Sequence, residues 1–259
     1  MTKVVILCGG MGTRLREETE YKPKPLVEIG GRPIVWHIMK HYSHYGFNDF
    51  ILCLGYKGDL VKQYFLNYKT EINNFTISLK TGNITIHNNN NNNEDWNVTC
   101  IDTGAESLTG KRIKLIEPYL GEDEHFMVTY CDGVSDVDVN ALLAFHKQHG
   151  KVGTLTGIKP LSKYGALRIT DDATNTITTF IEKPQLNDRI NGGFIVFNKD
   201  IFKYLDDQMF EKSTLPSLSS KGQLSMFLHD GFWHCMDTYR DYLHLNKLWK
   251  EQKPWKVWE

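Results

Sequence analysis

The fold is decided by residues 4–15, which read Val4-Val5-Ile6-Leu7-Cys8-Gly9-Gly10-Met11-Gly12-Thr13-Arg14-Leu15. The apolar start predicts a short buried strand, and a glycine-rich turn follows it. Glycines let the backbone approach a ligand and point N–H groups at it. Arg14 and then Lys24, in Lys22-Pro23-Lys24-Pro25, add positive charge where phosphate oxygens would lie. The stretch therefore predicts a nucleoside triphosphate site.

Two other phosphate-binding patterns do not fit this turn. A dinucleotide-binding loop needs Gly-x-Gly-x-x-Gly, but from Gly10 the chain continues Gly-Met-Gly-Thr-Arg-Leu, so the third glycine is missing. The Walker A pattern, Gly-x-x-x-x-Gly-Lys-Ser/Thr, occurs nowhere in the chain. The plain alternative is an ordinary strand-to-turn connection with exposed cations, which the doubled Lys-Pro pattern argues against.

Composition bounds the class of protein. The chain has 259 residues, 41% of them hydrophobic and 24% charged, with a net charge of −1. These values predict a soluble globular protein with neither nucleic acid nor membrane as a partner. The first residues lead directly into a strand, without the pattern of a signal peptide. Five scattered cysteines suggest buried thiols in a reducing cytoplasm, so we expect a cytoplasmic protein.

The first half of the chain alternates expected strands and helices. Strands are expected at Val4–Leu7, Phe50–Leu54, Phe126–Tyr130 and Val152–Ile158. Helices are expected over 34–45, 60–68, about 110–120 and 139–149, the last capped by Asp138. This order predicts an α/β fold, with a Rossmann-like, mostly parallel sheet and helices on both faces. Ligands of such sheets gather at the carboxyl ends of the strands.

Residues 70–103 interrupt the alternation and are expected to form a small antiparallel β and loop insertion. Its short strands are expected at Phe75–Leu79, Ile84–His87 and Trp96–Ile101. The six asparagines Asn88–Asn93 have no apolar face, and we interpret them as the tip of a mobile loop. A metal-binding or aggregating role for this tract is the alternative.

The second half is richer in strands and closes with an amphipathic helix, roughly Tyr239–Glu251. Its strands are expected at Ala166–Ile169, Thr176–Ile181, Gly193–Phe197, Leu224–Leu228 and Phe232–Met236. No linker or repeat is visible, so residues 1–259 are expected to be one domain, with 239–259 as C-terminal helix and tail. Trp255 and Trp258 are expected to dock on a surface of this chain or of a neighbouring subunit.

Together these residues resemble a known family. Residues 7–15 with Lys22-Pro23-Lys24-Pro25 look like the signature of the sugar-nucleotide pyrophosphorylases, nucleotidyltransferases that act on sugar 1-phosphates. Later segments narrow the resemblance to the glucose-1-phosphate cytidylyltransferases of that family, and it covers essentially the whole chain. These segments include Trp36–Lys40, Gly55–Gly58, Trp96–Thr99, Asp102–Gly104, Asp132–Val134, Glu182–Pro184, Asn191–Phe194, Gly231–Trp233, Met236–Asp241 and Pro254–Trp258.

The resemblance implies the nucleotide-diphospho-sugar transferase fold, with a strand-rich sugar-binding half. The implied reaction joins CTP and α-D-glucose 1-phosphate into CDP-glucose and pyrophosphate, for surface polysaccharide synthesis. Lys24, Arg14 and Asp132 would be catalytic, and Asp132 with Asp237 would hold Mg²⁺. A homo-oligomer is also implied. Lys22 could either contact a ligand or be structural.

The resemblance also assigns the substrate-binding residues. The nucleotide would contact Leu7, Cys8, Gly9, Gly10, Met11, Gly12, Thr13, Arg14, Lys24, Thr109, Arg112 and Cys131. Thr109 could equally be a helix N-cap, and Arg112 could instead contact phosphate. The sugar phosphate would contact Tyr164, Gly165, Glu182, Lys183, Asn191 and Gly192.

Two segments depart from the expected cytidylyltransferase pattern. Residues 211–216 read Glu-Lys-Ser-Thr-Leu-Pro where a Glu-Pro-Leu run is expected, and the asparagine tract replaces a more basic loop. A relative that uses UTP or dTTP, or another sugar phosphate, therefore stays open. A non-catalytic binding module and an NAD-binding dehydrogenase domain are further alternatives. The first should have lost Arg14, Lys24 or an aspartate, and the second lacks its third glycine.

Overall fold

The computed structural model describes residues 2–87, 94–162, 164–169 and 175–259. The tract Asn88–Asn93, expected to be a loop tip, lies outside these residues. The helices are α1 (Arg16–Thr19), α2 (Ile34–His44), α3 (Gly58–Leu66), α4 (Tyr68–Ile72), α5 (Thr109–Leu115), α6 (Val139–His149), α7 (Thr214–Ser220) and α8 (Tyr239–Glu251). None of the helices in these ranges is long and apolar enough to cross a membrane.

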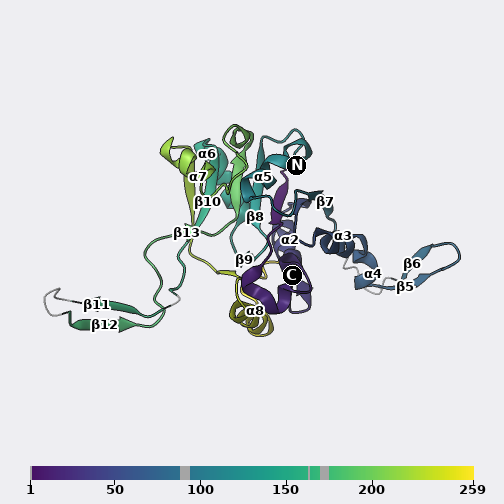
Figure 1. Ribbon diagram of the computed structural model, residues 1–259, viewed down its shortest axis with the longest axis horizontal. Helices are drawn as coiled ribbons and strands as arrows, with labels where there is room; N and C mark the ends of the chain where they lie inside the picture. Colours follow the sequence, from purple (N-terminus) through teal and green to yellow (C-terminus); the bar gives the residue numbers. More distant parts are fainter. Residues whose placement is uncertain (1, 88–93, 163, 170–174) are drawn as a thin grey trace.

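A central sheet carries the fold (Figure 1). Its strand order is β13 (Ile190–Asn191), β10 (Gly153–Ile158), β14 (Ile195–Asn198), β8 (His125–Tyr130), β1 (Val4–Cys8), β4 (Asp49–Leu54) and β7 (Asn97–Asp102), with β15 (Leu224–His229) also paired to β10. The neighbours β8, β1, β4 and β7 run parallel, whereas β14 is antiparallel to both β8 and β10. The expected α/β fold with a largely parallel sheet is confirmed.

Two apolar clusters cover the two faces of this sheet. One face packs against α2, α6 and α8, and the other packs against α5 and α7. Alternate residues of β1 divide between the clusters: Val4 and Ile6 join the first, and Val5 and Leu7 the second. A strand that is buried on both faces has a continuous run of apolar residues, which explains why residues 4–7 predict a buried strand.

Two helix ends show how local sequence sets the boundaries. α6 begins where expected because Asp138 accepts a hydrogen bond from the backbone N–H of Ala141 (2.9 Å). The helix expected over about 110–120 ends earlier, at Leu115. Pro118 has no backbone N–H to donate to the carbonyl four residues earlier, so the α-helix does not continue through it and the chain forms a short 3₁₀ turn, Glu117–Tyr119.

The segment 70–103 divides into two parts. β5 (Asn74–Ile77) and β6 (Ile84–His87) pair only with each other in the described chain and form an arm that projects from the body (Figure 1). β7 instead pairs along its length with β4 and becomes the edge of the central sheet. Its residues Val98 and Cys100 pack against the core, so β7 belongs to the central sheet and not to the expected insertion.

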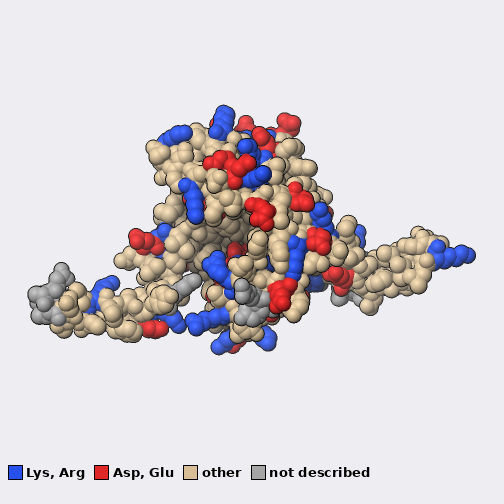
Figure 2. Space-filling model, in the orientation of Figure 1, with Lys and Arg blue, Asp and Glu red and all other residues tan. Residues whose placement is uncertain are grey.

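A second arm consists of β11 (Ala166–Ile169) and β12 (Ile177–Ile181), on the opposite side of the body (Figure 1). Over the face shown in Figure 2, positive and negative side chains are mixed on the body, whereas the β5–β6 arm is mostly uncharged between its base and its tip. Large apolar side chains on the two arms are exposed, as described below, although apolar residues of a stable hairpin normally need cover.

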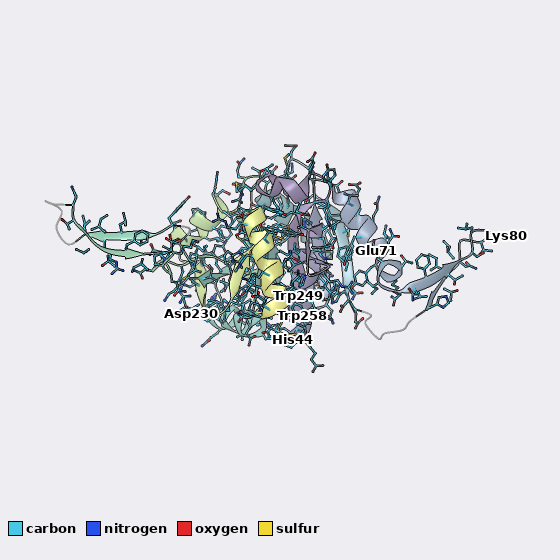
Figure 3. All side chains as sticks on the ribbon, turned by 90° about the horizontal axis from the view of Figure 1, so that it is seen from below. His44, Glu71, Lys80, Asp230, Trp249 and Trp258 are labelled. Carbon is cyan, nitrogen blue, oxygen red and sulfur yellow. The ribbon has the colours of Figure 1, made fainter. Side chains whose placement is uncertain are left out.

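The C-terminal tail docks on its own chain, so contact with a neighbouring subunit is not needed to bury it. Trp255 and Trp258 are 1% and 8% exposed and join the core cluster beside α2. The Trp255 indole N–H donates to Nδ1 of His37 (3.3 Å). Figure 3 shows Trp249 of α8 close to Trp258 under the helix.

Candidate active site

The candidate catalytic residues meet at the carboxyl ends of the parallel strands. The glycine turn follows β1, and Asp132 follows β8. Asp237 arrives from β16 (Trp233–Cys235), which pairs with β9 (Gly133–Ser135) directly after Asp132. Lys24 lies in a short 3₁₀ turn whose start is fixed by Pro23 and Pro25. Four segments far apart in the sequence thus meet at one edge of the sheet, as expected for this fold.

Lys24 is held between the two aspartates. Its ammonium Nζ lies 2.7 Å from Oδ2 of Asp132 and 2.9 Å from Oδ1 of Asp237. The Arg14 guanidinium is 3.1 Å from the same Oδ1 of Asp237, but its side chain is 69% exposed and free to move. The two positive and two negative charges therefore neutralise one another.

The environment shifts the pKa values of Lys24 and Asp237 so that both side chains are ionised. Burial lowers the pKa of Lys24, but the charge of Asp132 and the hydrogen bonds that Lys24 donates to both aspartates outweigh it and raise that pKa above its usual value. Burial raises the pKa of Asp237, but the hydrogen bond and charge of Lys24, with the charge of Arg14, bring that pKa below its usual value. Lys24 and Asp237 therefore both stay charged around neutral pH.

A cation already occupies the space between Asp132 and Asp237, namely the Lys24 ammonium. Two carboxylates that converge on one positive charge fit a divalent ion, because such ions beside a polyphosphate need few protein ligands. Within the described ranges no group of three or more His, Cys, Asp or Glu could hold a metal ion.

Arg112 supports the glycine turn from below. Its guanidinium donates to the carbonyl oxygens of Gly9 (3.1 Å), Leu54 (3.0 Å) and Ala105 (3.2 Å) and to the Thr103 hydroxyl (2.7 Å). A Cβ on Gly9 would lie 2.1 Å from the guanidinium carbon, so any other residue there would displace the Arg112 head group from its hydrogen bonds. Sequence reasoning expected Arg112 to bind nucleotide; the structure gives it backbone partners while leaving it on the cavity wall.

A cavity of about 340 Å³ opens beside this cluster. Most of the expected nucleotide-binding residues line it: Leu7, Gly9, Gly10, Gly12, Thr13, Arg14, Lys24, Thr109, Arg112 and Cys131, together with Asp132. A Cβ on Gly10 would meet no atom within 4 Å, so the turn borders open space there.

Two members of the expected nucleotide set lie elsewhere. The Cys8 side chain is fully buried in the core under the turn, because alternate strand residues face opposite sides. Met11 is 48% exposed and lines a neighbouring hollow. Four lining residues were missed: Ser107, Leu108, Tyr130 and Met209. No motif marks them, since loops and a strand end bring them in separately.

The expected sugar-phosphate residues divide into two groups. Asn191 donates from Nδ2 to the hydroxyl of Tyr130 (3.3 Å), which places it beside the cavity, and Gly192 follows it. Tyr164, Gly165, Glu182 and Lys183 lie at the base of the β11–β12 arm instead. Glu182 and Lys183 face each other there at 3.8 Å, with more than half of each side chain exposed.

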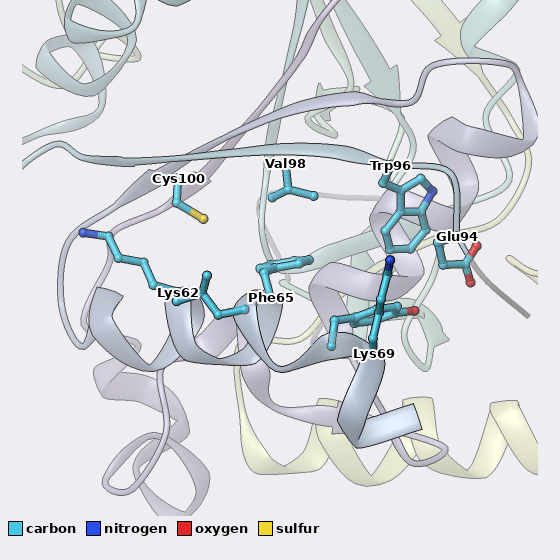
Figure 4. Close-up of a pocket in the computed structure, with 9 residues that line it drawn as sticks. Lys62, Phe65, Lys69, Glu94, Trp96, Val98 and Cys100 are labelled. Atoms are coloured by element: carbon cyan, nitrogen blue, oxygen red, sulfur yellow. The ribbon is translucent and has the colours of Figure 1, made fainter. Parts of the chain in front are cut away.

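A larger cavity lies elsewhere in the described chain. It measures about 460 Å³ and lies between α3, α4 and the edge strand β7 (Figure 4). Phe65 and Trp96 face each other across it, with Lys62 and Lys69 on the rim. It contains neither the glycine turn nor the aspartate pair, so the smaller cavity is the candidate active site.

Comparison with known proteins places the whole chain. Residues 3–252 match the Nucleotidyl transferase family. Glucose-1-phosphate cytidylyltransferase from Salmonella typhimurium is 47% identical over 99% of this chain and 100% of its own, and a probable glucose-1-phosphate cytidylyltransferase from Bacillus subtilis is 43% identical over the same shares. The crystal structure of HddC from Yersinia pseudotuberculosis is 25% identical, with a TM-score of 0.70 over 96% of this chain and 100% of that one. HddC has also been solved with GMP-PN. The chain therefore belongs to the nucleotidyl transferase family.

Proposed function

We propose that this nucleotidyltransferase moves the cytidylyl group of CTP to α-D-glucose 1-phosphate, releasing pyrophosphate and forming CDP-glucose. The meeting of Lys24, Asp132 and Asp237 beside a glycine-lined cavity carries the proposal. The two cytidylyltransferase relatives, at 47% and 43% identity over nearly the whole chain, support the choice of substrates.

The reaction brings two anions together. A phosphate oxygen of the sugar 1-phosphate attacks the α-phosphorus of the nucleotide, and the bond from that phosphorus to the pyrophosphate oxygen breaks. The protein must neutralise and align these groups rather than form a covalent bond. Lys24 would bridge the α-phosphate and the sugar phosphate once it leaves the aspartates. Arg14 and the turn amides from Gly10 to Thr13 would hold the leaving pyrophosphate.

A divalent cation, which we propose to be Mg²⁺, would be held by Asp132 and Asp237. When bound, it supplies positive charge to the phosphate oxygens and so lowers their mutual repulsion. The aspartates also position Lys24, whose ammonium they hold at 2.7 and 2.9 Å. Asp241 supports Asp237 in turn: its carboxylate accepts the backbone N–H of Asp237 (3.2 Å) and caps α8 with Thr238.

The sugar side would be formed by Asn191 and Gly192 near the cavity. The arm residues Glu182 and Lys183, with Tyr164 and Gly165, remain proposed sugar-phosphate ligands. Their exposed position means that the arm must bend inward, or a ligand must reach its base, for contact to occur.

Release of pyrophosphate tests the function directly. We expect turnover with CTP, glucose 1-phosphate and Mg²⁺, and at least ~100-fold lower kcat/KM with UTP or dTTP. Faster turnover with UTP or dTTP, or with another sugar 1-phosphate, would favour the alternative that the enzyme serves a different nucleotide or sugar. No turnover with any pair would exclude both.

We also propose that the enzyme is a homo-oligomer in which a second copy covers the arms. Apolar side chains on the arms are 40–90% exposed: Phe75, Ile77, Leu79, Ile84, Leu167, Ile169, Ile177, Phe180 and Ile181. Leu167 and Phe180 are cross-strand partners and form one apolar spot. The double variant Leu167→Thr/Phe180→Thr should lower the mass measured by light scattering. Leu243→Gln on α8, where the leucine is 52% exposed, should not.

A cytoplasmic location completes the proposal, because thiols such as the five cysteines of this chain remain reduced there.

A further inference from the structure

Glu211 connects two walls of the nucleotide cavity without lining it. Its carboxylate accepts the Thr109 hydroxyl at 2.6 Å through Oε2 and the Tyr130 hydroxyl at 2.8 Å through Oε1. Thr109 begins α5 and Tyr130 ends β8, and both line the cavity. Glu211 comes from the loop before α7, in the segment where the sequence departs from the expected pattern.

This arrangement decides which hydrogen-bond role, donor or acceptor, each hydroxyl has left for a ligand. An ionised carboxylate only accepts hydrogen bonds, so each hydroxyl must donate its single hydrogen to Glu211. Each hydroxyl oxygen keeps two lone pairs. On Tyr130 one lone pair accepts from Asn191 Nδ2 (3.3 Å), and on Thr109 one accepts from the backbone N–H of Phe210 (3.1 Å). Toward a ligand, these hydroxyls can therefore accept but not donate.

The wall formed by Thr109 and Tyr130 lies where the base of a bound nucleotide would be. Arg14, Lys24 and Asp132 supply the charges that a triphosphate needs, so the phosphates belong at that end of the cavity. In the remainder, Arg112 is bonded to backbone carbonyl oxygens and Thr109, Tyr130 and Met209 are uncharged, so this part is left for the nucleoside.

The pyrimidines differ in the group that such a wall would meet. Cytosine carries an amino donor at position 4, whereas uracil and thymine carry a carbonyl acceptor there. A wall that only accepts pairs with the amino group and repels the carbonyl. We propose that Glu211 is a positioning residue that sets the preference for CTP over UTP and dTTP, by holding Thr109 and Tyr130 as acceptors. This inference rests on the proposed function and names the origin of its base selectivity.

The variant Glu211→Gln tests the polarity with little change of shape. A glutamine amide can donate to one hydroxyl, which frees the hydrogen of that hydroxyl for the ligand. We expect the ratio of kcat/KM for CTP to that for UTP to fall at least ~10-fold, the size of one base-reading contact. Calorimetric Kd values for CTP and UTP without sugar phosphate should show the same fall.

Two further variants separate polarity from loop folding. Tyr130→Phe removes one acceptor and should also lower the CTP-to-UTP ratio, which keeps the inference testable if Glu211→Gln does not fold. Asp206→Asn is the matched control: Asp206 accepts Ser213 Oγ (2.9 Å) and the Gln208 N–H (3.0 Å) in the same loop, but neither partner lines the cavity. It should leave the ratio unchanged.

The outcomes distinguish this inference from the proposed function. In one outcome the wild type prefers CTP, and the folded variants Glu211→Gln and Tyr130→Phe keep the same CTP-to-UTP ratio. This outcome overturns only the role of Glu211. A wild type that binds UTP as tightly as CTP overturns both. A wild type that prefers CTP but ignores glucose 1-phosphate overturns the proposed sugar, and the Kd ratios still decide the role of Glu211.

Discussion

Replacing Arg112 with methionine would show whether the glycine turn depends on a support beneath it. Arg112 is only 4% exposed, and its guanidinium holds three carbonyl oxygens and one hydroxyl. Methionine keeps much of the apolar stem and removes all four hydrogen bonds. A residue that only touched the nucleotide could be removed without loss of stability in the free protein.

The expected loss of stability depends on which hydrogen bonds the carbonyl oxygens retain once Arg112 is replaced. Hydrogen bonds to a charged group are worth about 1.5–3 kcal/mol each, so four would sum to about 6–12 kcal/mol. The Gly9 carbonyl keeps the N–H of Tyr56, and the Leu54 carbonyl keeps the N–H of Thr103. Burial also lowers the pKa of Arg112, which shows that its charge is costly to hold there. We therefore expect a loss of about 3 kcal/mol, well below the sum.

Urea unfolding measures this loss. With a slope of about 2–3 kcal/mol per M, the midpoint should fall by about 1–1.5 M. The KM for nucleotide should rise as well, because the turn at Gly9 loosens. Arg189→Met is the matched control, since Arg189 donates to the carbonyls of Gly157 (2.8 Å) and His229 (3.0 Å) and to Asp230 (2.6 Å) away from the nucleotide cavity.

Arg189→Met should lower stability without raising the nucleotide KM. The reasoning is refuted if Arg112→Met costs less than about 1 kcal/mol while the KM rises, because Arg112 would then be a ligand contact alone. It is also refuted if both variants raise the KM equally.

Three other predictions follow from the same contacts. Lys24→Met should lower kcat at least ~100-fold. Because the variant frees Asp132 and Asp237, it should also bind Mn²⁺ more tightly than the wild type when both are measured by calorimetry without nucleotide. An unchanged Mn²⁺ affinity would contradict the pairing of Lys24 with the aspartates. Asp132→Ala should lower kcat by a similar factor with an unchanged circular dichroism spectrum, and near-normal turnover would remove Asp132 from the site. Burial lowers the pKa values of His37 and His41 to about 4 in the folded protein. As the pH falls below 6.5, the unfolded chain therefore binds protons before the folded one does. The stability that these histidines contribute is complete above pH 6.5 and declines toward pH 4. Each histidine should cost about 1.4 kcal/mol at pH 5.5, and equal urea midpoints at pH 5.5 and 7.5 would show that neither is buried neutral.

The parts of the fold that follow local rules could be predicted from the sequence. α8 spans the expected Tyr239–Glu251 because Thr238 and Asp241 form a capping box at its start. The apolar stripe from Ile34 to Tyr42 gave α2, which ends before the positive-φ Gly46. The placing of β7 in the sheet and of Trp255 in the core depended on partners far along the chain, which no local pattern contains.

The candidate site divides in the same way. Arg14, Lys24, Asp132 and Asp237 could be predicted, because a charged residue after an apolar strand has a clear signal and the resemblance gave each a role. Glu211 had no such signal: it is a single carboxylate in a loop, and its importance comes from two hydroxyls about 80 and 100 residues before it. Residues that act by orienting others are the ones that sequence reasoning misses.

The resting arrangement of Lys24 also limits how substrates can enter. While Lys24 holds both aspartates, only one of its three N–H groups is left for a phosphate, and leaving the aspartates unpaired in a half-buried place is unfavourable. It can move only when another positive charge comes to Asp132 and Asp237 and a negative one comes to Lys24. A nucleoside triphosphate with its divalent counter-ion brings both charges at once, whereas a sugar monophosphate brings mainly the negative one. The ion pairs of the free site thus favour entry of the nucleotide first, and they leave Lys24 available for the sugar phosphate only when the group to be transferred is already in place.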